Sequence, residues 1–235
     1  MTDSEFEAKF RAIAATVRQK LEHSSGCHDF DHTQRVLANA MRLADELPPA
    51  DRRVVRMAAL LHDIARPEEM ADEGRTCHAE LGAELVVPLL REAGFGEAFT
   101  AHVSAAVLTH RYRSGRIPAS LEAEIVYDAD KLDSLGAVGI GRAFLFAGRV
   151  HARLHNTEKE AVLSPAYSRE DTAYREYLVK LRHLPGGMLT EPGRRIARGR
   201  ARFMRTFFRR LNEETGLNLD SEHHVPAADS DGAIH

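Results

Sequence analysis

The chain has 235 residues, and its 32 lysines and arginines nearly balance 35 aspartates and glutamates, so the net charge is −3 with neutral histidine. Hydrophobic residues make up 43% of the sequence, which is enough for the core of one ordinary domain and excludes a wholly disordered chain. The small negative charge argues against nucleic-acid binding as the main role, and no apolar run approaches the roughly 20 residues that cross a bilayer.

The N-terminal residues are acidic and polar, whereas a secretion signal begins with basic residues followed by an apolar stretch. The two cysteines, Cys27 and Cys77, do not belong to a Cys-x-x-Cys pair, so neither a disulfide scaffold nor a thiolate metal site is indicated. We therefore expect a cytoplasmic protein with reduced thiols. Histidine is unusually frequent, with 13 copies, which directs the search for chemistry to imidazole side chains.

Helical periodicity begins near the N-terminus and continues through almost the whole chain. The first apolar face recurs at spacings of three and four residues and consists of Phe6, Phe10, Ile13, Val17 and Leu21. Further helices are predicted at about residues 31–47, 51–65, 77–93, 98–110, 119–133 and 170–184. Because no alternating strand pattern of useful length occurs, the sequence predicts an all-α fold.

The predicted domain covers residues 1–215 and ends with C-terminal helices at 170–215. Residues 149–169 are expected to form a loop or an irregular insertion. Residues 216–235 contain turn-forming residues without apolar periodicity, which indicates a mobile tail. The sequence therefore predicts a single helical domain followed by a short tail.

A late amphipathic helix between Glu191 and Leu211 carries an unusual run of arginines. Five of them step by three and four residues and share one face, namely Arg195, Arg198, Arg202, Arg205 and Arg209. The apolar side chains expected to dock this helix lie roughly opposite and are Ile196, Phe203, Phe207 and Leu211. The arginine face is either a solvated face with carboxylate partners in the chain or a contact surface for anions.

Residue types that bind metals are concentrated in the first two-thirds of the chain. In chain order they are His32, the adjacent His62 and Asp63, His78, His110 and Asp130. His62 and Asp63 directly follow the apolar run 57–61, where two polar groups would be costly to bury without a partner. A divalent cation is such a partner, because neutral imidazole and carboxylate suit manganese, iron, cobalt, nickel or zinc.

The order and local contexts of these residues resemble those of the HD-domain superfamily of metal-dependent phosphohydrolases, in particular its small bacterial members. The resemblance covers about residues 27–147 and implies a helical bundle with a metal site in its core. The metal ligands that it implies are His32, His62, Asp63 and Asp130. They would hold one or two divalent ions of manganese, iron, cobalt, nickel or magnesium.

Asp130 is selected among three nearby aspartates because the segment Ala129-Asp130-Lys131-Leu132 fits the last element of the family pattern. Asp128 and Asp133 are then candidates for supporting the ligands or capping a helix. At the start of the motif region, Asp29 or Asp31 is expected to cap the helix that carries His32.

The resemblance further implies phosphoester hydrolysis by attack of a metal-bound hydroxide on phosphorus. The expected catalytic residues are Asp63, Lys131, His78 and His110. The expected substrate contacts are Arg35, Lys131, His78 and His110. Lys131 could instead be an ordinary solvated lysine, and Arg35 could pair with Asp29 or Asp31.

His78 and His110 have a second possible role. Some family members use two further histidines, placed between the His-Asp pair and the final aspartate, as ligands of a second metal. His78 and His110 occur in that order here, so a dinuclear site is an alternative to direct contact with the substrate.

Departures from the patterns of particular subgroups narrow the expected substrate. Family members that act on nucleoside monophosphates or stringent-response nucleotides have a glutamate where this chain has Arg66, followed by Pro67. The Gly-Tyr-Pro signature of the cyclic-dinucleotide phosphodiesterases does not occur. Residues 128–139 look most like small members associated with nucleoside triphosphate hydrolysis, so we expect the substrate to be a nucleotide polyphosphate.

Two functions of other classes remain open. A dinuclear iron version of the same residues could oxidise a substrate with dioxygen, as a few family members do. A non-catalytic regulatory protein could keep the fold and bind its partner through the arginine face, Arg195 to Arg209. The sequence leaves the oligomeric state open.

Overall fold

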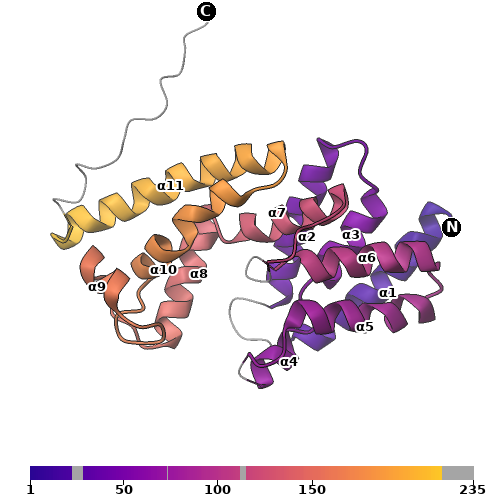
Figure 1. Cartoon of the computed structure of the whole chain (residues 1–235), viewed down its shortest axis with the longest axis horizontal. Helices are drawn as coiled ribbons and strands as arrows, with labels where there is room; N and C mark the ends of the chain where they lie inside the picture. The colour runs from indigo at the N-terminus through magenta and orange to yellow at the C-terminus, as the bar shows by residue number, and fades with distance from the viewer. Residues whose placement is uncertain (23–28, 73, 112–114, 219–235) are drawn as a thin grey trace, which may run out of the picture.

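The computed structural model describes residues 1–22, 29–72, 74–111 and 115–218, and these residues form helices and no strand (Figure 1). The predicted all-α fold is therefore confirmed. The helices in chain order are α1 (Asp3–Leu21), α2 (Phe30–Asp45), α3 (Arg52–Leu61), α4 (Arg66–Ala71), α5 (His78–Glu92), α6 (Glu97–Thr109), α7 (Leu121–Asp133), α8 (Gly136–Arg149), α9 (Glu158–Leu163), α10 (Ala173–Val179), a 3₁₀ helix (Leu181–Gly187) and α11 (Glu191–Thr215). None of the described helices combines the length and apolar composition that a membrane span requires.

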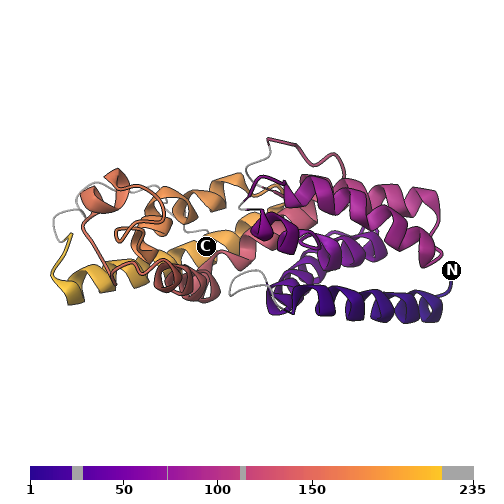
Figure 2. The ribbon, with the colours of Figure 1, turned by 90° about the horizontal axis from the view of Figure 1, so that it is seen from below.

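The helices form two neighbouring lobes that meet at α7 (Figures 1 and 2). Helices α1 to α6 make up the first lobe, and α8 to α11 make up the second. Helix α7 packs against α2, α3 and α6 on one side and against α8 and α11 on the other. The residues near the C-terminal end of α7 therefore lie where the two lobes meet.

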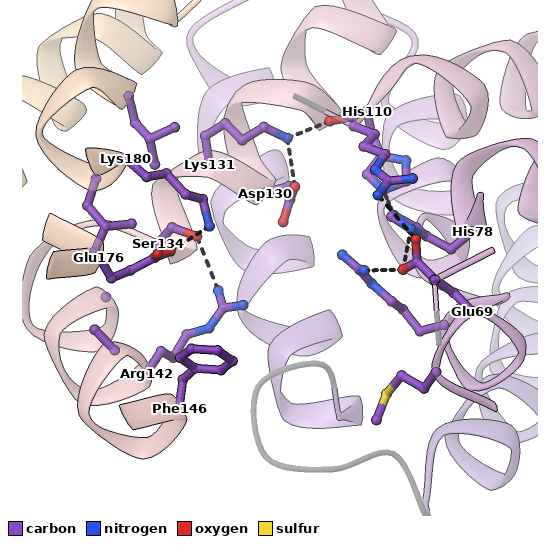
Figure 3. Close-up of a pocket in the computed structure, with 18 of the residues that line it drawn as sticks. Glu69, His78, His110, Asp130, Lys131, Ser134, Arg142, Phe146, Glu176 and Lys180 are labelled. Atoms are coloured by element: carbon purple, nitrogen blue, oxygen red, sulfur yellow. Dashed lines mark hydrogen bonds and ion pairs between the residues drawn. The ribbon is translucent and has the colours of Figure 1, made fainter. Parts of the chain in front are cut away.

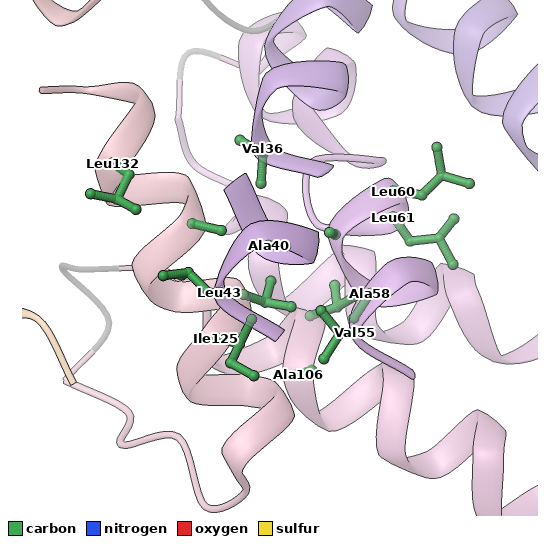
Figure 4. Close-up of a cluster of buried hydrophobic side chains, with 14 of the residues drawn as sticks. Val36, Ala40, Leu43, Val55, Ala58, Leu60, Leu61, Ala106, Ile125 and Leu132 are labelled. Carbon is green, nitrogen blue, oxygen red and sulfur yellow. The ribbon is translucent and has the colours of Figure 1, made fainter. Parts of the chain in front are cut away.

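The core of the first lobe is centred on α3, whose residues from Val54 to Leu61 are all buried except Arg56. A helix that is apolar on nearly all sides has to lie inside a bundle. Figure 4 shows its side chains packed among those of α2 and α7. Because α3 ends at Leu61, the following His62 and Asp63 are carried into the centre of the protein.

Two helices, α4 and α8, were not predicted. The structure also differs from the prediction at residues 149–169 and 170–184. Helix α8 contains four glycines, which lower its intrinsic helix propensity, and its packing against α10 and α11 outweighs that preference. The expected loop at 149–169 contains α9, which begins at a capping box formed by Thr157 and Glu160. The helix predicted at 170–184 is divided into α10 and the 3₁₀ helix.

Helix α11 has the predicted arginine face, and three of the four apolar side chains predicted to dock it, Ile196, Phe207 and Leu211, are partly buried against the core. The five arginines are exposed, Arg195 pairs with Glu46 at 2.6 Å, and Arg198 lies 3.5 Å from Glu191. Phe203, which was expected to dock the helix, is 51% exposed. The fully buried apolar side chains of α11 are those of Ala197, Met204 and Phe208. They follow one another by seven and four residues and so share one side of the helix.

The C-terminal end of α11 is anchored to the second lobe. Gly216 ends the helix in the left-handed conformation, with φ of 67°. The Asn218 side chain then donates a hydrogen bond to the carbonyl oxygen of Asn156 at 3.1 Å. The first residues of the predicted tail are therefore attached, whereas residues 219–235 and Cys27 lie outside the described residues.

The first turn of α8 has no space for a side chain at Gly139, because the residues that end α7 lie against it. A Cβ atom there would lie 2.2 Å from the carbonyl oxygen of Ser134. We expect Gly139→Ala to lower the free energy of unfolding by about 3 kcal/mol, because the backbone has to move. Chemical denaturation measures the change.

Gly141, on the same helix, is the matched control, because a Cβ atom there would meet nothing within 4 Å. Gly141→Ala is expected to leave the protein unchanged or to stabilise it by up to about 1 kcal/mol. Equal stabilities of the two variants would show that the turn can relax around a methyl group.

Candidate metal centre

The four histidines of the predicted site lie at or near helix ends, and all four are buried. His32 is in the first turn of α2, and the N-cap residue Asp29 accepts a hydrogen bond from the His32 N–H at 2.9 Å. Asp29 therefore caps this helix, as one of the two predicted candidates. His62 and His110 follow the last residues of α3 and α6, and His78 begins α5.

His32, His62 and Asp130 form a first group of ligand atoms that could hold a metal ion. The Nε2 atoms of His32 and His62 are 3.2 Å apart, and His32 Nε2 lies 3.5 Å from Asp130 Oδ1. Three of the four ligands implied by the family resemblance thus meet from α2, the end of α3 and α7.

Asp63, His78 and His110 form a second such group. The Nε2 atoms of His78 and His110 are 3.1 Å apart and lie 3.4 and 3.5 Å from Asp63 Oδ1. The other carboxylate oxygen, Oδ2, lies 3.5 Å from His32 Nε2 and 3.6 Å from His62 Nε2. Asp63 therefore directs one oxygen to each group and lies between the two.

Carboxylates orient two of the imidazoles from behind. The Nδ1 atom of His32 lies 2.7 Å from Asp133 Oδ2. The Nδ1 atom of His78 lies 2.8 Å from Glu69 Oε2. A carboxylate at Nδ1 holds the proton on that nitrogen and leaves the lone pair on Nε2.

Backbone carbonyl groups orient the other two imidazoles in the same way. The Nδ1 atoms of His62 and His110 lie 2.9 and 2.6 Å from the carbonyl oxygens of Ala59 and Val107. All four Nε2 atoms then present lone pairs to one another and to the oxygens of Asp63. Such an arrangement repels itself unless positive charge lies inside it, so these residues fit divalent cations.

The pKa shifts of His62, His110 and Asp130 favour the protonation states that bind a metal. The pKa of His32 is instead raised, because the contacts of His32 with Asp133 and Asp63 outweigh the lowering effect of burial. Burial lowers the pKa of His62 to about 4 and also lowers the pKa of His110, so both imidazoles are neutral at pH 7. Burial alone would raise the pKa of Asp130, but the neighbouring Lys131 ammonium opposes it, and the pKa lies well below its usual range. Neutral imidazole and ionised carboxylate are what a cation requires.

Asp133 contacts His32 and is itself held in place by two arginines. Besides His32, its carboxylate accepts hydrogen bonds from Arg35 Nε at 2.7 Å and from Arg142 at 2.8 Å. Arg35 thus pairs with Asp133 and not with Asp29 or Asp31, the partners weighed from the sequence. Its guanidinium is committed to positioning Asp133, and it is not among the residues that line the cavity described below.

Asp133→Asn is expected to weaken metal binding by about 10- to 100-fold, because an amide holds the His32 Nδ1 proton less strongly than a carboxylate does. Titration with Mn²⁺ in competition with a fluorescent chelator measures the change.

Asp128 provides the matched control, since it is a second buried carboxylate on α7. It accepts hydrogen bonds from the backbone N–H groups of Leu189 and Thr190, both at 2.8 Å, and so docks the start of α11. Asp128→Asn should lower stability without changing metal affinity. An equal loss of affinity in Asp128→Asn and Asp133→Asn would indicate a general structural effect and contradict the role of Asp133.

A cavity of about 780 Å³ opens beside the metal-binding groups, where the two lobes meet (Figure 3). His78, His110 and Asp130 reach its lining from the ligand groups. Its basic lining residues are Arg66, Arg111, Lys131, Arg142 and Lys180. A cavity lined in this way is suited to an anionic ligand of the size of a nucleotide.

Lys131 is buried at the boundary between the cavity and the ligand groups. Its Nζ atom donates to Asp130 Oδ2 at 2.8 Å and to the carbonyl oxygen of His110, and it lies 4.4 Å from the centre of the Tyr127 ring. The alternative of a solvated lysine does not fit this burial.

Several residues of the site were missed from the sequence. Glu69, which orients His78, follows soon after the His-Asp pair, and the acidic segment after Pro67 was the available signal. Arg142 and Lys180 lie on α8 and after α10, and no local pattern connects them with the motif. Only the meeting of the two lobes brings them to the cavity.

Comparisons with known proteins agree with this geometry. The family model of the HD domain matches residues 29–135, which include all six ligand candidates. The chain is 33% identical over 206 residues to the uncharacterized protein YpgQ of Bacillus subtilis (strain 168), covering 86% of this chain and 91% of that protein.

Two solved structures are similar over most of their length. A crystal structure of Bacillus subtilis YpgQ in complex with ADP has a TM-score of 0.69 and 28% identity, covering 89% of this chain and 96% of that one. The crystal structure of a predicted HD superfamily hydrolase from an uncultured Thermotogales bacterium has a TM-score of 0.63 and 32% identity. The match covers 88% of this chain and 92% of that one.

Proposed function

Because this chain belongs to the HD-domain family, we propose that it is a metal-dependent phosphohydrolase that cleaves a nucleoside triphosphate or a related nucleotide polyphosphate. The observation that carries the proposal is the cavity in which basic side chains face two convergent groups of metal ligands. The crystal structure of YpgQ with ADP supports a nucleotide as the ligand class.

We propose that two divalent ions bind, one to His32, His62 and Asp130 and the other to His78 and His110, with Asp63 shared between them. Manganese is the ion we would test first. When bound, such ions supply Lewis-acid charge and make a water molecule more acidic. In this arrangement His78 and His110 serve as ligands, because their Nε2 atoms face Asp63, and not as proton donors to the leaving group.

The chain's own cations hold the phosphates. Lys131 Nζ lies beside Asp130, where it can stabilise charge that develops on a phosphate oxygen during bond cleavage. Arg66 and Arg111 line the cavity on the side of Glu69, and their charges are partly balanced by that carboxylate. Phosphate oxygens would therefore meet positive charge on both sides of the ligand groups.

The test is the release of phosphate and pyrophosphate from a panel of nucleoside mono-, di- and triphosphates with Mn²⁺. We expect release from triphosphates, and the ratio of the products identifies the bond that breaks. Asp130→Ala is the control, because it removes a carboxylate from the first ligand group. Release that persists in Asp130→Ala, or no release from protein shown to hold metal, would contradict the proposal.

A dinuclear iron oxygenase is the second candidate, because the position of Asp63 between two histidine groups suits two irons as it suits two other divalent ions. Two irons per chain together with dioxygen uptake would identify it. The regulatory alternative, binding through the arginine face, predicts that function survives Asp63→Ala.

A further inference from the structure

The cavity wall that belongs to the second lobe carries two aromatic rings that the proposed chemistry does not use. Phe146 lies on α8, and Tyr167 lies in the segment between α9 and α10. Both line the cavity. Their ring centres are 5.9 Å apart, and the ring planes meet at 65°. Figure 3 shows Phe146 beside Arg142, on the opposite side of the cavity from His78.

The backbone holds Tyr167 in an unusual conformation. Its φ is 61°, in the left-handed region that side chains other than glycine rarely adopt. The Tyr167 N–H donates to Oδ2 of the buried Asp171 at 2.7 Å, and Asp171 is in turn paired with Arg175 at 3.1 Å. The turn is thus built to present this ring, which is 75% exposed at the cavity. Strained residues of this kind cluster at ligand sites.

Charge and aromatic surface follow one another along the face of α8 that lines the cavity. Gly139, Arg142, Ala143 and Phe146 share this face. Arg142 contacts Asp133, so it lies close to the end of α7 and to the ligand groups. Phe146 follows one helical turn later, about 6 Å farther along the axis of α8. The order from the ligand groups outward is therefore cationic and then aromatic. A nucleotide has the matching order of phosphates, sugar and base.

We propose that the base of the nucleotide stacks on the exposed ring of Tyr167, which Phe146 contacts edge to face, while the phosphates of the nucleotide face the ligand groups. The inference rests on the proposed function to the extent that the ligand is a nucleotide. Stacking accepts any base, because every base has a π-face. The pocket is therefore expected to discriminate little between bases.

The test compares two non-hydrolysable ligands in the presence of Mn²⁺. One is α,β-methylene-ADP, and the other is methylenediphosphonate, which has the same phosphorus bridge but no base. Tyr167→Ala is expected to lower the affinity for α,β-methylene-ADP about tenfold, which is the usual scale for losing one stacked ring. The affinity for methylenediphosphonate should not change. Isothermal titration calorimetry measures both affinities. Tyr167→Phe, which keeps the ring, should bind both ligands as the wild type does.

Leu163→Ala is the matched control. Leu163 is a similarly exposed apolar residue nearby on α9, and it does not line the cavity. Its replacement should change neither affinity.

A second readout uses the absence of tryptophan from the chain. Tyr167→Trp introduces a single indole, whose fluorescence should be quenched by α,β-methylene-ADP and not by methylenediphosphonate. This signal does not depend on a change in affinity.

Three results would overturn the inference. The first is that wild type and Tyr167→Ala bind α,β-methylene-ADP with equal affinity. The second is that Tyr167→Ala loses affinity equally for α,β-methylene-ADP and for methylenediphosphonate. The third is that the wild type does not bind α,β-methylene-ADP. Failure of the proposed function is a separate outcome. If the protein binds α,β-methylene-ADP through Tyr167 but hydrolyses no nucleotide, the base site is supported and the phosphohydrolase function is wrong.

Discussion

Asp63→Ala is expected to abolish binding of both proposed metal ions and to reduce turnover by at least about a thousandfold. The reason is the place of Asp63 between the groups, with Oδ1 3.4 Å from His78 Nε2 and Oδ2 3.5 Å from His32 Nε2. Its loss removes the anionic ligand that both ions would share. Metal content by mass spectrometry and nucleotide hydrolysis measure the two effects.

His78→Ala and Asp130→Ala are the matched controls, because each removes a ligand from one group only. We expect both to retain one ion per chain while Asp63→Ala retains none. Circular dichroism should show intact helices in all three variants. If Asp63→Ala retained two ions or full turnover, the shared role of Asp63 would be wrong.

Lys131→Met is expected to retain metal and to lower turnover by about 100- to 1,000-fold, the usual effect of losing one charge that stabilises a transition state. Methionine keeps the length of the buried stem and removes only the ammonium. Since this ammonium pairs with Asp130 Oδ2 at 2.8 Å, its loss frees that oxygen, so metal binding should be unchanged or tighter. Metal titration and steady-state kinetics separate the two properties.

Lys180→Met is the control for Lys131→Met, because Lys180 is the other lysine among the described lining residues and pairs with Glu176 at 2.7 Å. Its effect on turnover is expected to be much smaller. Normal turnover of Lys131→Met would remove Lys131 from the reacting part of the site. Loss of metal in Lys131→Met would instead make it a support for Asp130.

The helices with strong periodicity could be read from the sequence, whereas α4, α8 and α9 could not. Helix α3 was predictable because its apolar run leads directly to His62 and Asp63. Helix α8, with four glycines, has a weak local signal, and packing against α10 and α11 stabilises it. For the same reason Phe203 was misplaced, because contacts with the second lobe decide which side of α11 is buried.

The sequence by itself determined the helical class and the ligand candidates, because a 3.6-residue period and a His-Asp pair after an apolar run are local features. Only the tertiary structure decided how these candidates divide into two groups around Asp63, and that Arg35 holds Asp133. It also decided which residues of the second lobe face the cavity. These relations join residues up to about a hundred positions apart, as with His32 and Asp133, and depend on how whole helices pack, which no local pattern encodes.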